Sequence, residues 1–230
     1  MIYLTMSDTQ SPQTIYVSRK LALNSPFWKL EKKGHTVIGK SLLKYKSLPL
    51  PKVPAHNAVF FYSRRGIRRY LKERPYDPHL FYGVMGAASN REFRSITGRP
   101  ADIIGQGDMK EIAKMVNQRW RGYKVLFPMA RNSLHSMSKY KVDIKMRPLV
   151  IYHNKFRKKA RIPSADHLVF TSPMNFLAYV EHHEIRDQSF YAIGLTTGAV
   201  MEGVLGQRPI IAQQPSIKAL YKLVKQELKK

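Results

Sequence analysis

The sequence contains no cysteine, no long apolar run and little acidic charge. The absence of cysteine excludes a disulfide framework, a cysteine nucleophile and a thiolate metal site, and it fits a reducing compartment. No stretch reaches the about 18 consecutive apolar residues of a membrane-spanning helix, and residues 1–14 lack the basic start and apolar core of a signal peptide. We therefore expect a soluble, cytoplasmic protein.

Acidic residues are scarce beside basic ones. The chain has 15 Asp and Glu against 40 Lys and Arg, so its net charge is +25. This imbalance favours a polyanionic partner, and nucleic acid is the first candidate. The charge also fits a surface bias of the source proteome, or a small substrate that carries many carboxylates. The basic residues are scattered over several segments, and no zinc finger, RNA-recognition signature or basic zipper is recognisable.

The chain alternates short apolar strands with helical segments. Its 230 residues, 43% of them hydrophobic, fit one large domain or two small ones. The run AVFFY at residues 58–62 predicts a buried strand followed by a helix from Ser63, and Asp108 is placed to cap another helix. This alternation predicts an α/β fold with parallel sheets flanked by helices.

Several residues recur in the second half of the chain at a common spacing. Gly86 recurs as Gly194 and Gly98 as Gly206, both 108 positions later. The strand end Phe61-Tyr62-Ser63 recurs 109 positions later as Phe170-Thr171-Ser172, and one loop insertion accounts for the difference. Because single glycine matches arise by chance, the prediction depends on the common spacing. We predict two copies of one βα-type unit that arose by internal duplication.

Two strand-to-helix junctions follow each other between Asp166 and Val200. The first strand ends at Thr171-Ser172-Pro173 and the second at Gly194-Leu195-Thr196-Thr197. Hydroxyl groups and free backbone N–H groups at helix N-termini can hold anions. Weaker copies of these junctions occur at Ser63-Arg64 and at Gly86-Ala87-Ala88-Ser89.

The motifs FTSPMN, AIGLTT, IAQQPSIKAL and VLFPMARNSL together resemble the uroporphyrinogen-III synthase family, which closes the tetrapyrrole ring. The resemblance also takes in IYVSR, FFYSRRGI and IIGQGDMKEIAK, so it covers nearly the whole chain from Thr14. It implies two α/β domains joined by two extended connections that run side by side, with a ligand cleft between them. After a polar tail, residues 1–13, one domain would comprise residues 14–41 and 153–230, and the other residues 42–152.

The family resemblance also implies a reaction. The substrate would be hydroxymethylbilane, a linear tetrapyrrole with many carboxylates, which is cyclised to uroporphyrinogen III with inversion of the fourth pyrrole and loss of water, a step of haem biosynthesis. The resemblance implies no cofactor and a monomer. We expect no metal either, because the adjacent His182 and His183 diverge on a helix and cannot chelate together. Gly105-Gln106-Gly107 lacks the third glycine of a dinucleotide-binding turn.

Tyr152 is the candidate proton donor to the departing hydroxyl group, since it matches a tyrosine of the family. Packing at the hinge is an equal alternative for it. The resemblance implies substrate contacts at both sets of junctions, namely at Thr171, Ser172, Gly194, Thr196 and Thr197, and at Ser63, Arg64 and Ser89. Each hydroxyl could instead cap its helix without a ligand. Positive charge at the helix start is unfavourable without a nearby anion, so Arg64 could contact substrate or simply face water.

Two functions from other classes remain open on the sequence alone. One is a basic nucleic-acid-binding module, which rests on the charge. The second is a catalytically inactive bilobal binding protein with the same fold, because Ser89 and Arg64 depart from residues common in the family at these junctions.

Overall fold

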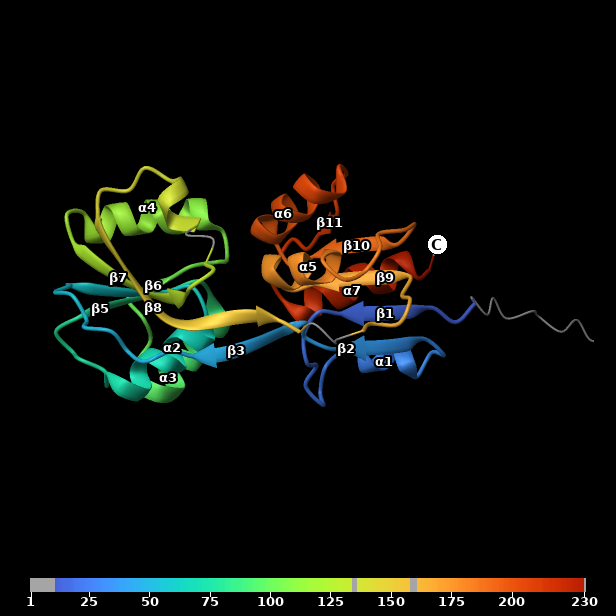
Figure 1. The fold of residues 1–230 in the computed structure, drawn as a ribbon, viewed down its shortest axis with the longest axis horizontal. Coiled ribbons are helices and arrows are strands. Elements are labelled where there is room, and N and C mark those ends of the chain that lie inside the picture. Colours follow the sequence, from blue (N-terminus) through green and yellow to red (C-terminus); the bar gives the residue numbers. More distant parts are fainter. Residues whose placement is uncertain (1–10, 134–135, 158–160, 230) are drawn as a thin grey trace, which may run out of the picture. The chain divides into compact units, whose positions relative to one another are not determined.

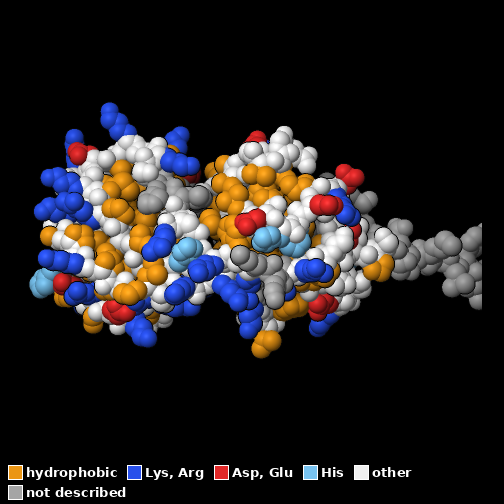
Figure 2. Space-filling model, in the orientation of Figure 1, with side chains coloured by type: hydrophobic (Ala, Val, Ile, Leu, Met, Phe, Trp, Pro, Cys, Tyr) orange, Lys and Arg blue, Asp and Glu red, His pale blue; other side chains and the backbone are white. Residues whose placement is uncertain are grey.

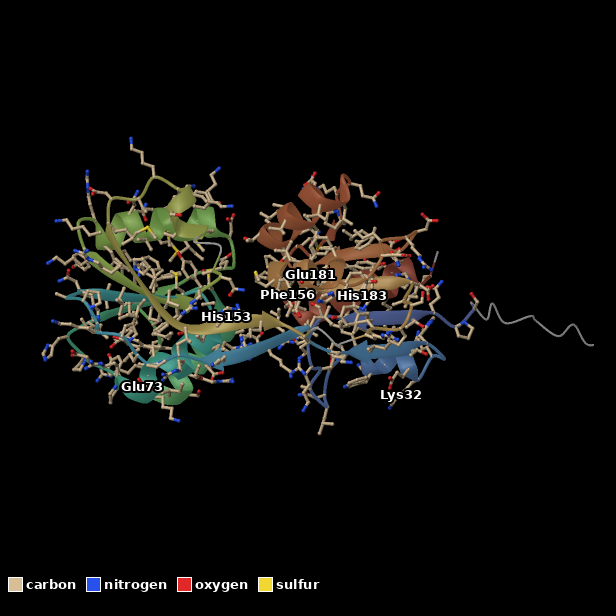
Figure 3. The ribbon with its side chains drawn as sticks, in the orientation of Figure 1. Lys32, Glu73, His153, Phe156, Glu181 and His183 are labelled. Carbon is tan, nitrogen blue, oxygen red and sulfur yellow. The ribbon has the colours of Figure 1, made fainter. Side chains whose placement is uncertain are left out.

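A computed structural model describes residues 11–133, 136–157 and 161–229 (Figure 1). The chain divides into two compact units. Unit 1 comprises Met1–Leu42 and Arg157–Lys230, and unit 2 comprises Leu43–Phe156. The second division follows Phe156 rather than Tyr152, because the last strand of unit 2 continues through His153 to Phe156 (Figure 3). The two segments that join the units are hydrogen-bonded, since the N–H of Arg157 donates to the carbonyl of Leu42 (2.8 Å).

Unit 1 is built on a five-stranded parallel sheet with the order β11-β10-β9-β1-β2. Strand β9 is buried along its whole length and β1 almost so, which suits parallel strands covered on both faces. The strands are β1 (Thr14–Val17), β2 (Thr36–Gly39), β9 (His167–Phe170), β10 (Ser189–Ala192) and β11 (Ile210–Ile211). The helices are α1 (Trp28–Glu31), α5 (Pro173–Val180), α6 (Leu195–Leu205) and α7 (Ile217–Glu227).

Unit 2 contains a six-stranded sheet with the order β3-β8-β7-β4-β5-β6, in which only β3 is antiparallel to its neighbour. Helices α2 and α3 lie on one face and α4 on the other (Figure 1), and each face has its own buried core. The strands are β3 (Leu43–Ser47), β4 (Ala58–Phe61), β5 (Phe81–Val84), β6 (Ile103–Ile104), β7 (Lys124–Ala130) and β8 (Lys145–Phe156). The helices are α2 (Arg64–Glu73), α3 (Ala87–Thr97), α4 (Met109–Trp120) and a short 3₁₀ helix at Ser136–Lys139.

The expected α/β class, with parallel sheets flanked by helices, is confirmed. Both units contain the same run of elements, β4-α2-β5-α3-β6-α4 in unit 2 and β9-α5-β10-α6-β11-α7 in unit 1. Helices α3 and α6 begin at Ala87 and Leu195, which are 108 positions apart. The internal duplication itself remains a prediction, because a shared order of elements does not establish a common origin.

Gly66 lets helix α2 approach strand β7 closely. A Cβ atom at this position would lie 2.9 Å from the carbonyl oxygen of Pro128, which is backbone and has little freedom to move. Gly203, inside helix α6, has no atom within 4 Å of the position that its Cβ would take. Both glycines lie within regular helices, but a side chain at Gly66 would meet backbone, whereas one at Gly203 would meet open space.

We expect Gly66→Ala to destabilise the protein by about 1–3 kcal/mol, because overpacking outweighs the better helix propensity of alanine. Gly203→Ala is the matched control, and we expect it to raise stability by up to about 1 kcal/mol. Urea unfolding followed by circular dichroism measures both changes. Equal stabilisation by the two variants would show that α2 has room to shift.

Candidate functional site

In each sheet there is one pair of neighbouring parallel strands from which the chain continues to the next strand in opposite directions along the sheet. In unit 1 this pair is β1, which continues to β2, and β9, which continues to β10. In unit 2 it is β4, which continues to β5, and β7, which continues to β8. Ligands of open α/β sheets bind outside the carboxyl ends of the strands at such a pair. Thr171 follows β9 and Ser63 follows β4, so sequence and topology point to the same edges.

Thr171 is bound to the neighbouring strand end in unit 1. Its backbone N–H donates to Oγ of Ser18, which directly follows β1 and is fully buried (2.8 Å). The hydroxyl oxygens of the two residues are 3.4 Å apart. The N–H of Thr171 is thus already engaged, and its partly buried hydroxyl makes a long hydrogen bond to the carbonyl of Ser18 (3.5 Å), which a carboxylate can displace.

Ser172 caps helix α5, as its position before Pro173 indicates. Its Oγ accepts hydrogen bonds from the backbone N–H (3.3 Å) and the side-chain amide (3.0 Å) of Asn175. Because a hydroxyl both accepts and donates, the hydrogen of Ser172 remains available to an anion. The carbonyl of the Asn175 side chain accepts in turn from Ser41 Oγ (3.2 Å) and from the N–H of Leu42 (2.9 Å).

The start of helix α6 has no side-chain cap, because Gly194 precedes it. The backbone N–H of Thr197 donates to the carbonyl of Gly194 (3.1 Å). The Thr196 side chain is exposed, whereas Thr197 is only 3% exposed and faces the sheet side of the helix. The uncapped first turn and the helix dipole make this end of α6 receptive to a negative group.

Ser63 and Tyr152 meet at the corresponding edge of unit 2. Ser63 Oγ caps α2 by accepting from the N–H of Gly66 (3.0 Å), and it lies 2.9 Å from the hydroxyl of Tyr152. Tyr152 is 7% exposed on β8, and its carbonyl accepts from the N–H of Arg131 at the end of β7 (2.9 Å). Burial raises the pKa of Tyr152, while the hydrogen bond to Ser63 and the charge of Arg65 oppose this rise. The phenol therefore keeps its proton at neutral pH and can donate it.

Arg64 and Ser89 complete the expected residues of unit 2. Arg64 is the exposed first residue of α2, and its charge contributes, after the hydrogen bond from Arg68, to a lowered pKa of Glu92 in α3. Glu92 is thus an anion close enough to offset part of the unfavourable charge at this helix start. Ser89 is 8% exposed in the first turn of α3, which follows Gly86 and has no side-chain cap.

Four side chains at these edges were not among the residues expected from the sequence. Ser18 and Asn175 hold the strand ends and helix starts of unit 1, and the Arg65 guanidinium stacks on the ring of Tyr45 in unit 2. The motif IYVSR contains Ser18 directly after an apolar strand, so a signal for it was present. Asn175 and Tyr45 carry no such signal, because their partners lie far away in the sequence.

His182 and His183 lie in the turn after α5 rather than on a helix as expected, because α5 ends at Val180; His182 is exposed, whereas His183 makes structural contacts. The ring of His183 stacks on Tyr179 (4.5 Å between centroids), and its Nε2 accepts from the N–H of Ile162 (3.0 Å); His183 and Glu181 are labelled in Figure 3. Over residues 11–133, 136–157 and 161–229, no group of three or more His, Asp or Glu residues could hold a metal ion. In the same ranges, no helix is long and apolar enough to cross a membrane.

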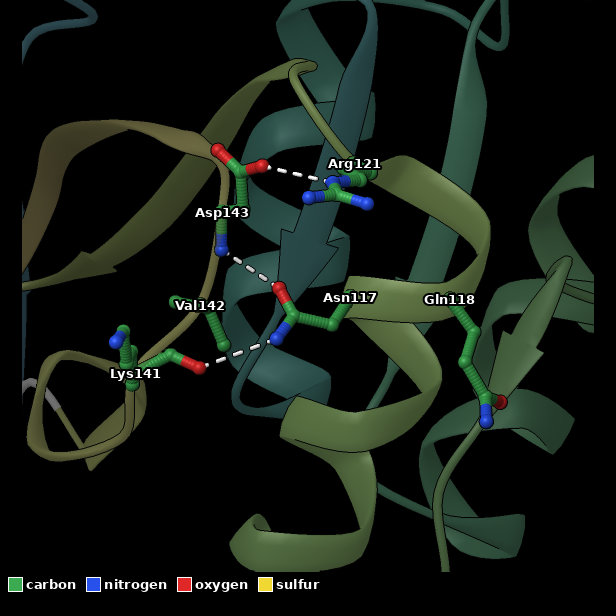
Figure 4. A pocket seen from close by; sticks show the side chains of 6 residues that line it. All are labelled: Asn117, Gln118, Arg121, Lys141, Val142 and Asp143. Atoms are coloured by element: carbon green, nitrogen blue, oxygen red, sulfur yellow. Dashed lines mark hydrogen bonds and ion pairs between the residues drawn. The ribbon is translucent and has the colours of Figure 1, made fainter.

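A surface hollow of about 730 Å³ lies elsewhere on unit 2 (Figure 4). Its polar side chains bind one another, since Asn117 bonds to the backbone of Lys141 and of Asp143, and Arg121 pairs with Asp143 (2.9 Å). It sits where α4 ends and before β8 begins, at the amino ends of the strands. None of the expected site residues lines it, so it is no part of the candidate site.

Residues 28–222 match the protein family described as uroporphyrinogen-III synthase HemD. The chain belongs to the uroporphyrinogen-III synthase family. The resemblance noted in the sequence motifs is thereby confirmed. No curated protein sequence matches the chain.

Two solved structures support the fold. The uroporphyrinogen-III synthetase of Helicobacter pylori is 18% identical, with a TM-score of 0.59, over 94% of this chain and 99% of that one. A mutant uroporphyrinogen III synthase of Thermus thermophilus is 16% identical, with the same TM-score and the same coverage of both chains. At these identities the similarity establishes the two-domain α/β fold alone.

We expect Asn175→Leu to destabilise unit 1 by roughly 1–3 kcal/mol, because the buried N–H of Leu42 loses its acceptor. Ser41→Ala removes the other bond to the same oxygen but leaves no buried donor unpaired, so its expected cost is below about 1 kcal/mol. Urea unfolding followed by circular dichroism compares the variants. Equal losses would mean that Asn175 does not hold the Leu42 backbone.

Proposed function

We propose that this protein cyclises hydroxymethylbilane to uroporphyrinogen III, with inversion of the fourth pyrrole and loss of water. The single observation that carries this proposal is the family match over residues 28–222. The match favours neither a nucleic-acid-binding module nor an inactive binding protein. The edges described above supply hydroxyl groups, helix starts and a protonated phenol at the positions expected for the site.

The substrate is a polycarboxylate, and the surface charge suits it. Lys and Arg side chains are spread over the visible face of both units, whereas Asp and Glu are few there (Figure 2). This arrangement raises the local concentration of an anionic substrate. We propose that the uncapped starts of α3 and α6, with Ser89 and Thr196, and the hydroxyls of Thr171 and Ser172 bind its carboxylates.

The proposed reaction requires from the side chains only one proton for the leaving hydroxyl group and a fixed geometry of the bound substrate. The pyrrole nitrogen lone pairs expel the hydroxyl group and leave a cationic azafulvene, so the protein needs to orient the chain ends and stabilise charge. Tyr152 donates its proton to the leaving hydroxyl, which departs as water. Its buried, protonated phenol, 2.9 Å from Ser63 Oγ, supports this role.

The oligomeric state, the cellular compartment and the binding partners of the active protein are further parts of the proposal. We propose a monomer that acts in the cytoplasm, needs no cofactor and has no specific nucleic-acid partner. Size-exclusion chromatography with light scattering tests the oligomeric state, and a dimer mass at micromolar concentration would contradict it.

The reaction is tested by supplying hydroxymethylbilane enzymatically and separating the products by chromatography. We expect isomer III from the protein, and we expect Tyr152→Phe to lower kcat by about a hundredfold with little change in KM, the size typical of losing a general acid. Tyr140→Phe, at an exposed tyrosine, is the matched control and should retain full activity. Formation of the spontaneous isomer I alone would refute the enzyme proposal, and a fully active Tyr152→Phe would refute the proton donor.

We further expect Thr196→Val to lower kcat/KM more than Ser89→Ala, because Thr196 is the threonine of this turn whose side chain is exposed. The turn in unit 1 carries Thr196 and Thr197, whereas Ala87 and Ala88 precede Ser89 in unit 2, so the unit 1 turn offers more hydroxyl groups. Valine has nearly the shape of threonine, and the Thr196 side chain is exposed, so the change costs little packing. Steady-state kinetics decide the comparison, and equal, negligible effects would exclude these hydroxyls from substrate binding.

A further inference from the structure

Strand β3 and the start of helix α2 bring two further side chains to Tyr152. In the antiparallel register of β3 and β8, Ser47 lies opposite Tyr152 and Tyr45 lies opposite Asn154. Directly opposed side chains, and those two positions apart on one strand, point to the same face of a sheet. Tyr45 and Tyr152 are therefore diagonal neighbours on one face.

The guanidinium of Arg65 lies over the ring of Tyr45. Its central carbon is 2.8 Å from the ring centroid, an arrangement in which the face of the ring attracts the cation. Arg65 is the second residue of α2, two positions after the Ser63 that contacts the Tyr152 hydroxyl. An exposed arginine at a helix start would otherwise be free to turn into solvent, and the ring holds it against β3, the strand paired with β8.

We propose that Tyr45 is a positioning residue: its ring holds the Arg65 guanidinium near the Tyr152 hydroxyl, and this charge favours release of the Tyr152 proton. The inference rests on the proposed role of Tyr152 as the proton donor. As the carbon–oxygen bond of the substrate breaks, the Tyr152 proton passes to the leaving hydroxyl and water departs. The resulting phenolate is stabilised by Arg65, and the proton that the substrate loses after ring closure restores the phenol.

The electrostatics agree with this geometry. Burial raises the pKa of Tyr152, the hydrogen bond with Ser63 and then the charge of Arg65 lower it, and the Tyr45 phenol raises it. Tyr45 thus acts in two ways, since its ring holds a favourable cation while its own hydroxyl opposes ionisation. Other charged or titratable side chains on the elements packed against Tyr152 include Arg64 and Tyr70 on α2, of which Tyr70 shares the buried cluster of Tyr152. Arg131 follows β7, and Lys46 and His153 oppose each other on the other face of the β3–β8 pair.

The test measures ionisation of Tyr152 without substrate. Tyrosines are replaced by 3-fluorotyrosine, whose phenol ionises at lower pH, and the ¹⁹F signal of residue 152 is assigned from Tyr152→Phe. We expect Tyr45→Leu to move the midpoint of residue 152 to higher pH and Tyr45→Phe not to do so. Both variants lack the Tyr45 hydroxyl, so the difference between them isolates the ring. We expect kcat of Tyr45→Leu to fall roughly three- to tenfold relative to Tyr45→Phe, as a change of up to about one pKa unit in a general acid implies.

Two arginine variants complete the test. Arg65→Gln should raise the same midpoint, and Tyr45→Leu added to it should cause no further rise. Arg68→Gln, on the same helix but paired with Glu92, is the matched control and should leave the midpoint unchanged. An unchanged midpoint in Tyr45→Leu, or equal midpoints in Tyr45→Leu and Tyr45→Phe, overturns the inference. If Tyr45→Leu does not fold, an unchanged midpoint in Arg65→Gln overturns it instead.

This outcome is separable from failure of the proposed function. A fully active Tyr152→Phe refutes the proton donor but leaves the midpoints to decide whether Tyr45 and Arg65 control ionisation. If the ionisation midpoint of residue 152 does not change in the Tyr45 and Arg65 variants, the positioning role is refuted even where Tyr152→Phe is inactive.

Discussion

The backbone N–H groups at helix N-termini need hydrogen-bond acceptors, and this need determines which residues stand at the carboxyl edges of both sheets. Helices α2 and α5 satisfy theirs with serine caps, Ser63 and Ser172. Helices α3 and α6 follow glycine and have no side-chain cap. Each unit therefore combines a capped helix start, which fixes a hydroxyl group, with an uncapped start, which attracts negative charge. A polycarboxylate needs both, because fixed donors set its orientation and open dipoles compensate its charge.

The elements that depend on nearby residues could be predicted from the sequence. The caps at Ser63, Asp108 and Ser172 each lie within a few residues of the N–H group that they accept, so composition and spacing are enough to find them. The alternation of apolar strands and helices likewise determined the fold class. The family assignment followed from short motifs at the same strand ends, where the proposed substrate contacts also lie.

Contacts between distant segments could not be predicted in the same way. Thr171 and Ser18 are 153 positions apart, and the loss of the Thr171 N–H as a free donor follows only from the pairing of β1 with β9. The burial of Thr197 has a similar origin. A Cβ atom on the adjacent Gly198 would lie 2.5 Å from Ile211, so this side of α6 packs tightly on β11. Sequence spacing identified the turn but not which of its two threonines faces outward.

The pairing of β1 with β9 also has a consequence for how the chain is made. Strands β1 and β2 emerge from the ribosome before unit 2, but their sheet is completed only by strands that follow the whole of unit 2. Unit 2 is continuous in sequence and has all its strands by Phe156, so it can fold while unit 1 still lacks most of its core. The early fold of unit 2 shortens the effective loop that unit 1 must close, because β3 and β8 bring Leu43 and Phe156 together as paired residues. Pairing of β3 with β8 thus completes the sheet of unit 2 and also brings together the two chain segments from which unit 1 assembles.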